Sequence, residues 1–182
     1  TRECVSQKLL QDSDVDANLG FDCLPRFLHR HKLTNTHSPQ GHVLISGGVI
    51  LTNEYIHFYK EFIDWLSKED IPMRFLVGAK ANPAPEDVKF WELLKQQPNV
   101  RNMEIVEAKT MSGWVEEFKC ASFLFSARFH HTIAALSVGT PFECLPSNTP
   151  KISAILETLN EPSSITLSNE NGLNKVKKSV KL

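Results

Sequence analysis

The chain has 182 residues, of which 41% are hydrophobic and 23% are charged, and its 20 Lys and Arg residues nearly balance its 21 Asp and Glu residues. This length allows one well-filled core, and a net charge of −1 gives no field of one sign that would favour nucleic acid or an anionic membrane surface. No apolar run approaches the roughly 18 residues of a membrane span, and no signal pattern begins the chain. We therefore expect no nucleic acid and no membrane span, and any anion binding must be local.

Cysteines and histidines show no metal-binding pattern. The four cysteines lack metal-ligand spacing, and the seven histidines are scattered along the chain. The pairs His29 with His31 and His130 with His131 have no third ligand at usable spacing. We predict no metal site, and we interpret the cysteines as reduced thiols of a cytoplasmic protein.

We interpret residues 1–35 as a connector or the remnant of an upstream domain. Residues 2–11 favour a short helix, whereas residues 18–28 mix apolar residues with a glycine and a proline, as a short edge strand or connector would. Residues 29–40 are polar and rich in turn formers, which places a domain boundary near residue 35. The chain begins at Thr1 without a methionine, so we expect that an upstream portion has been removed.

Residues 36–160 alternate between strand and helix patterns. The expected strands are 42–46, 73–77, 102–106, 122–126 and 141–145, and the expected helices are 53–68, 85–96, 112–119, 131–138 and one entered near residue 150. In the helix over 85–96, the periodicity directs Val88, Trp91 and Leu94 toward the core. This alternation predicts an α/β fold: a Rossmann-like, doubly wound parallel sheet of about five strands.

The last segment, residues 161–182, is polar and basic. It carries four lysines at positions 175, 177, 178 and 181 and has few apolar residues. We expect an extended or loosely attached tail.

Strand order indicates where a ligand would bind. With the common order 3-2-1-4-5, the direction of winding reverses between the first and fourth strands, which places Gly47 and Gly48 opposite Arg128 and His130. Glycines let main-chain N–H groups approach a ligand, Arg128 can hold a carboxylate or phosphate with two parallel hydrogen bonds, and His130 can give or take a proton. Lys151 stands at the start of the next helix, where an anion is also favoured. We therefore predict an anion-binding crevice.

Residues 126–151 also carry a family resemblance. The run SARFHHTIAAL at 126–136, the GTP at 139–141 and Lys151 resemble the R-L-H, A-L, G-x-P and downstream Lys pattern of the polysaccharide pyruvyltransferase family. Arg2-Glu3, Ser6, Leu9-Leu10, Asp22 and Phe27-Leu28 look like the segment that joins the two domains of that family. Its members are similar to GT-B glycosyltransferases, with two Rossmann-like domains facing a cleft. They transfer a pyruvyl group from phosphoenolpyruvate to a sugar, as a ketal.

The resemblance implies a role for each matched residue. Arg128 would hold the phosphate or carboxylate of the donor, His130 would be the general acid that protonates the enol methylene, and Lys151 would be a further anion contact. The implied reaction needs no cofactor, only phosphoenolpyruvate as donor substrate and a sugar acceptor. The predicted site comprises catalytic Arg128 and His130, and substrate-binding Gly47, Gly48, His131 and Lys151. Two positions depart from the family pattern, because Phe129 replaces an aliphatic residue and His131 replaces a small one.

Chain length adds an expected partner and keeps alternatives open. A two-domain member needs roughly twice this length, so we expect the chain to correspond to the C-terminal half. Either an upstream domain of the same protein is its partner, or the protein has kept only this one domain. Our first hypothesis is a pyruvyltransferase-like enzyme. The second is a nucleotide-sugar glycosyltransferase half-domain, and the third is a non-catalytic binding domain that retains the fold.

Overall fold

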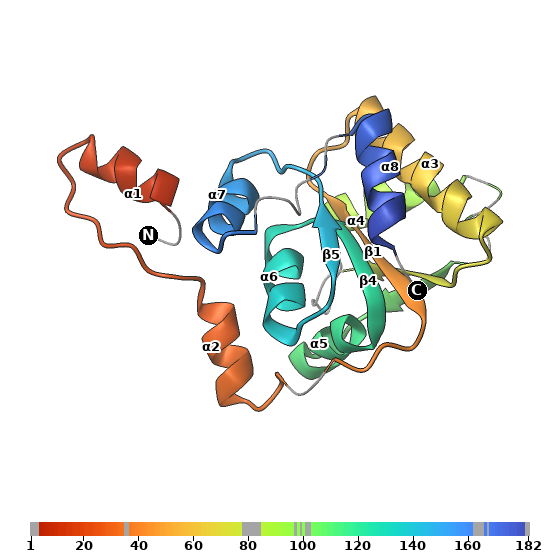
Figure 1. The fold of residues 1–182 in the computed structure, drawn as a ribbon, viewed down its shortest axis with the longest axis horizontal. Helices are drawn as coiled ribbons and strands as arrows, with labels where there is room; N and C mark the ends of the chain where they lie inside the picture. The colour runs from red at the N-terminus through yellow and green to blue at the C-terminus, as the bar shows by residue number, and fades with distance from the viewer. Residues whose placement is uncertain are drawn as a thin grey trace.

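A computed structural model of the chain describes residues 4–34, 37–77, 85–96, 98, 100, 103–161, 166 and 168–180 (Figure 1). The described residues form one sheet of five strands: β1 His42–Gly48, β2 Met73–Val77, β3 Glu104–Glu107, β4 Ala121–Ala127 and β5 Phe142–Cys144. All strand pairs are parallel, and the order is β3-β2-β1-β4-β5. The predicted doubly wound parallel sheet and its strand order are therefore confirmed.

Helices cover both faces of this sheet. Their bounds are α1 Cys4–Gln11, α2 Cys23–Arg30, α3 Asn53–Lys68, α4 Pro85–Leu94, α5 Met111–Cys120, α6 Phe129–Val138, α7 Lys151–Thr158 and α8 Glu170–Ser179. Side chains of α3, α4 and α8 share one core with one face of the sheet, and those of α2, α5, α6 and α7 share the other. None of the helices in the described ranges is long and apolar enough to cross a membrane.

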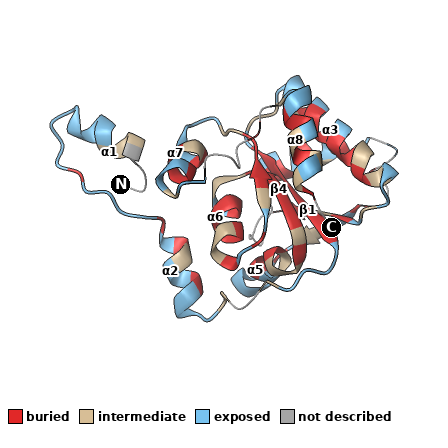
Figure 2. Ribbon diagram, viewed as in Figure 1, coloured by how far each residue is buried: buried red, intermediate tan, exposed pale blue. Residues whose placement is uncertain are grey.

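The two central strands lie between these layers. Every residue of β1 is buried, and β4 is buried at every position but one, as Figure 2 shows for the middle of the molecule. Long apolar runs of this kind are typical of central strands in parallel sheets, which are covered on both faces. On the α3 face, the rings of Tyr59 and Phe62 each lie 5.0 Å from the ring of Phe125.

The N-terminal segment differs from our prediction. Residues 18–28 do not form an edge strand or simple connector, because α2 occupies Cys23–Arg30. Asp22 caps this helix by accepting a hydrogen bond from the Leu24 N–H, and Pro25 lies in the first turn, where a missing N–H costs nothing. Leu24 and Leu28 are buried in the same core as α6. The predicted boundary at residue 35 lies outside the described residues.

The C-terminal segment also differs. Residues 170–179 form α8, whereas we predicted an extended or loosely attached tail. Leu173, Val176 and Val180 are spaced for one helix face and are buried against α3. The carboxylate of Glu143, buried on β5, accepts a hydrogen bond of 2.6 Å from Lys175. A lysine that suggested a solvated tail therefore compensates a buried charge.

Two glycines allow β1 to approach its neighbours closely. A Cβ atom added at Gly48 would lie 2.6 Å from the Cβ of Ala127 on β4, and one added at Gly47 would lie 2.7 Å from the ring of Phe90 on α4. Real Cβ contacts are not this short, so both positions require glycine for packing.

We expect Gly48→Ala to destabilise the fold by about 2 kcal/mol, because the new methyl group overpacks a rigid contact between two central strands. Ala127→Gly alone should cost about 1 kcal/mol, the usual price of a glycine within a strand. The double variant should lose less than the sum of the two, because removing the Ala127 methyl group makes room for the new one. Urea unfolding of the four proteins measures this coupling, and strictly additive losses would show that the contact does not limit the approach of the strands.

Candidate functional site

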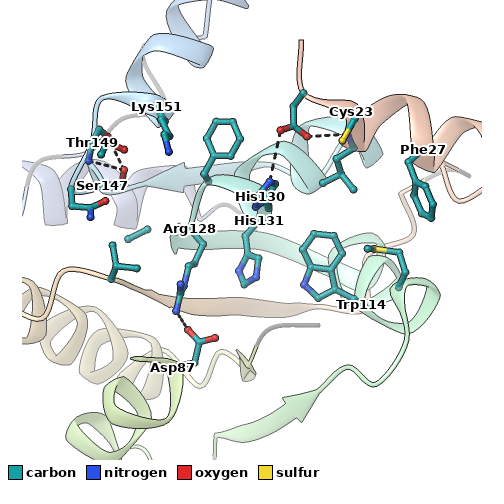
Figure 3. A pocket seen from close by; sticks show the side chains of 17 residues that line it. Cys23, Phe27, Asp87, Trp114, Arg128, His130, His131, Ser147, Thr149 and Lys151 are labelled. Atoms are coloured by element: carbon teal, nitrogen blue, oxygen red, sulfur yellow. Dashed lines mark hydrogen bonds and ion pairs between the residues drawn. The ribbon is translucent and has the colours of Figure 1, made fainter. Parts of the chain in front are cut away.

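A cavity of about 670 Å³ lies at the carboxyl ends of β1, β4 and β5. Its walls come from distant parts of the chain, including α2, α4, α5 and the loop before α7 (Figure 3). The lining residues are Asp22, Cys23, Leu24, Phe27, Val49, Asp87, Met111, Trp114, Ala127, Arg128, Phe129, His130, His131, Ser147, Asn148, Thr149 and Lys151. The cavity adjoins the β1–β4 pair, where the strand order reverses, and open α/β sheets bind ligands at such points.

The structure brings four of the six predicted site residues together. Arg128, His130, His131 and Lys151 all line the cavity, although they come from the starts of two helices, α6 and α7, that β5 separates. The two glycines, Gly47 and Gly48, are not among its lining residues, and their tight packing already accounts for their presence. Their contact with a ligand stays a prediction.

Arg128 is held by a buried carboxylate. Its Nη2 donates to Oδ1 of Asp87 from α4, as Figure 3 shows, and the two side chains are 21% and 6% exposed. The Nε of Arg128 has no hydrogen-bond partner among the described residues. The ion pair therefore orients the guanidinium, and part of its hydrogen-bonding capacity is left unused by the described residues.

A buried chain of hydrogen bonds fixes the backbone at Arg128. The Tyr59 hydroxyl donates to the Ser46 carbonyl at 2.8 Å, the Ser46 hydroxyl donates to the Ser126 hydroxyl at 2.6 Å, and the Arg128 N–H donates to the same Ser126 oxygen at 3.0 Å. Burial raises the pKa of Tyr59 well above its usual value, so its hydroxyl stays protonated and remains a donor. The turn from β4 into α6 is thus tied to β1 and α3.

Two helix starts at the cavity lack side-chain caps. Asp22, Thr52, Thr110 and Asn169 cap α2, α3, α5 and α8 through side-chain oxygens. Arg128 and Pro150, at the N-caps of α6 and α7, make no such bond. Because a helix start carries partial positive charge and unpaired N–H groups, both ends favour an anion in the cavity.

His130 lies at the mouth of the cavity beside an aspartate. Its side chain is 61% exposed, and its Nε2 is 3.8 Å from Oδ2 of the buried Asp22. This separation suits an ion pair when the imidazole is protonated, but it is too long for a hydrogen bond. Asp22 also caps α2, so one carboxylate links that helix to the candidate site.

His131 is a neutral group in this site. Its ring lies 5.5 Å from the rings of Trp114 and Phe118, and only 6% of the residue is exposed. Burial, together with the nearby charges of Arg128 and His130, lowers the pKa of His131 to about 3. The predicted substrate-binding role of His131 therefore has to be that of an uncharged imidazole.

Sequence reasoning missed Asp22, Asp87 and Trp114. The periodicity of α4 directed Val88 inward, but Val88 is exposed, whereas Asp87 and Phe90 are buried. No local pattern distinguishes Asp87 from a first-turn acidic residue, because its partner Arg128 is 41 positions away. Asp22 did have a signal, since an aspartate before a short helical pattern with an early proline is an N-cap signature.

Comparisons with known proteins give the fold. No protein-family model matches the sequence, and no curated protein matches it either. Among solved structures, the O-GlcNAc transferase of Thermobaculum terrenum aligns with a TM-score of 0.58 and 10% identity, covering 82% of this chain and 30% of that one. The E. coli heptosyltransferase WaaC with ADP aligns with a TM-score of 0.56 and 15% identity, covering 82% of this chain and 46% of that one. The same enzyme in complex with ADP-2-deoxy-2-fluoro heptose aligns with a TM-score of 0.55 and 12% identity, covering 94% of this chain and 52% of that one.

These similarities confirm the expected fold class and extend no further. The chain has the Rossmann-like α/β fold of one half of a GT-B glycosyltransferase, and it spans about half or less of each of these structures. They support a GT-B-like fold without supporting the pyruvyltransferase family in particular, so that resemblance stays a prediction.

The pKa of His131 predicts how stability depends on pH. In the unfolded chain this histidine takes up a proton below about pH 6.5, whereas in the folded chain it does so only near pH 3. The free energy of unfolding therefore falls as the pH decreases between those two values. The loss should approach 1.4 kcal/mol per pH unit, or about 2 kcal/mol from pH 7 to pH 5. In the His131→Phe variant, the free energy of unfolding should fall by about 2 kcal/mol less between pH 7 and pH 5 than in the wild-type chain. Urea unfolding at each pH measures this difference. Parallel profiles for the two proteins would contradict a buried, neutral His131.

Proposed function

We propose that this chain is the donor-binding half of a GT-B-type glycosyltransferase, and that its cavity binds the phosphate groups of a nucleotide-sugar donor. The observation that carries the proposal is the uncapped start of α6, whose residues Arg128 to His131 line the same cavity as Lys151. Backbone N–H groups, an oriented guanidinium and an ammonium group together suit a phosphate. The heptosyltransferase that shares this fold has been solved with ADP, which agrees with a nucleotide as ligand.

The residues divide the proposed work among them. Arg128 and the start of α6 stabilise the negative charge that develops on the phosphate as the donor bond breaks. Lys151 is exposed at the start of α7 and contributes a second cation. His130 is the group at the cavity mouth that can carry a proton to or from an entering substrate. In this proposal an upstream domain supplies the opposite wall of the cleft and the site that binds the sugar acceptor.

A second candidate is the pyruvyltransferase activity. The observation that favours it is that Arg128, His130 and Lys151, the three residues that carry the resemblance, line one cavity. Cations beside an acid would suit phosphoenolpyruvate, because Arg128 and Lys151 would hold its carboxylate and phosphate while His130 protonates its methylene carbon. This candidate shares the anion site with the first one and differs in the rest of the donor.

We expect calorimetric titration of the full chain to show saturable binding of ADP, tighter than that of phosphoenolpyruvate. Asp87→Asn keeps an oxygen that accepts the hydrogen bond from Arg128 but removes the competing negative charge, so it should strengthen ADP binding several-fold. The double variant Arg128→Gln with Asp87→Asn keeps a hydrogen-bonding pair but removes both charges, and it should weaken binding by about ten-fold or more.

Matched controls separate the outcomes. Lys151→Ala should weaken ADP binding, whereas Lys178→Ala, which removes an exposed lysine of α8 far from the cavity, should not. Tighter binding of phosphoenolpyruvate than of ADP would favour the pyruvyltransferase candidate. An ADP affinity that neither the Arg128 nor the Lys151 substitution changes, or no binding of ADP to the folded chain, would overturn the proposed anion site.

A further inference from the structure

Besides Nε of Arg128, two further buried polar atoms on the cavity wall have no hydrogen-bond partner among the described residues. They are Nδ1 of His131 and Nε1 of Trp114. Both residues line the cavity, and they are only 6% and 4% exposed. Their rings lie side by side, with centroids 5.5 Å apart (Figure 3). Buried polar atoms in native proteins almost always have partners, so this pair marks a place where a polar group from a ligand fits.

The chemistry of the pair suits a hydroxyl group. The indole of Trp114 can only donate a hydrogen bond, whereas a neutral imidazole has one nitrogen that donates and one that accepts. Because His131 stays neutral at physiological pH, it offers no charge to a carboxylate or phosphate. A hydroxyl group both donates and accepts, and it therefore matches the two side chains together.

The other residues that line the cavity narrow the class of ligand further. In Figure 3, Trp114 and Phe27 lie at one end of the cavity, whereas Lys151, Ser147 and Thr149 lie at the other, with Arg128 between them. Leu24 and Met111 also line the cavity and add apolar surface. A cavity with a cationic end and an aromatic end that offers hydrogen bonds suits a sugar ring attached to a phosphate.

We propose that Trp114 and His131 form a subsite that hydrogen-bonds a hydroxyl group of a bound sugar ring. The proposal rests on the proposed function for the anion end of the same cavity, and it adds the residues that select the sugar. Neither side chain has to change its charge, since the subsite acts through hydrogen bonds alone.

The test compares two probes, glucose 1-phosphate and inorganic phosphate, by NMR titration of the full chain. We expect glucose 1-phosphate to bind more tightly than phosphate. Trp114→Phe and His131→Phe each keep an aromatic ring but remove the polar atom, and each should weaken glucose 1-phosphate binding about ten-fold. Trp114→Phe, on α5 and away from the start of α6, should leave phosphate binding unchanged. Trp65→Phe removes an indole N–H from α3, which is not part of the cavity, and should change neither affinity.

A second measurement needs no variant in the subsite. The chain has three tryptophans, and the indole N–H resonance of Trp114 should shift when glucose 1-phosphate binds and stay in place when phosphate binds. Equal affinities for the two probes in the wild-type chain, or an unmoved Trp114 indole, would overturn the subsite and leave the anion site standing. If neither probe binds the folded chain, the proposed function fails, and the subsite fails with it.

Discussion

The candidate site depends on how the turn from β4 into α6 is held in place. At this turn Arg128 leaves the sheet, and two hydrogen bonds to different elements restrain it. The hydroxyl of Ser126, which is hydrogen-bonded to Ser46 on β1, accepts a hydrogen bond from the N–H of Arg128. Asp87 on α4 accepts a hydrogen bond from its guanidinium. Because neighbouring elements hold both the backbone and the side chain, the cation and the start of α6 keep a common orientation toward the cavity. Such preorganisation is what electrostatic binding of an anion requires.

The close approach of β1 and β4 belongs to the same arrangement. Gly48 lies against Ala127, one residue before Arg128, and Gly47 leaves room for Phe90 of α4. The glycines expected to contact a ligand thus act in the structure by letting the strands and α4 come together. Their effect on the site is indirect, because the same helix α4 carries Asp87 to Arg128.

Much of the fold could be predicted because its signals are local. The apolar runs and intervening amphipathic segments identify the five strands and most helices, and the common strand order then brings Arg128 and His130 near β1. That Arg128, His130, His131 and Lys151 would lie near one another could be predicted because they follow strands or begin helices, whereas their roles stay predictions. What sequence reasoning missed depends on pairs that are distant in the chain. The burial of Asp87 depends on its ion pair with Arg128. The packing of α8 depends in part on the hydrogen bond between Lys175 and the buried Glu143.

A titration of the isotope-labelled chain with pyrophosphate, followed by the backbone amide resonances, tests whether the start of α6 binds an anion. We expect the amides of His130 and His131, at the uncapped start of α6, to shift most and to saturate together. The amide of Tyr55 should barely move, because the side chain of Thr52 already caps that helix start. The largest shifts elsewhere, for example beside His57 and Lys177 in the groove between α3 and α8, or no saturable shift at all, would contradict the account.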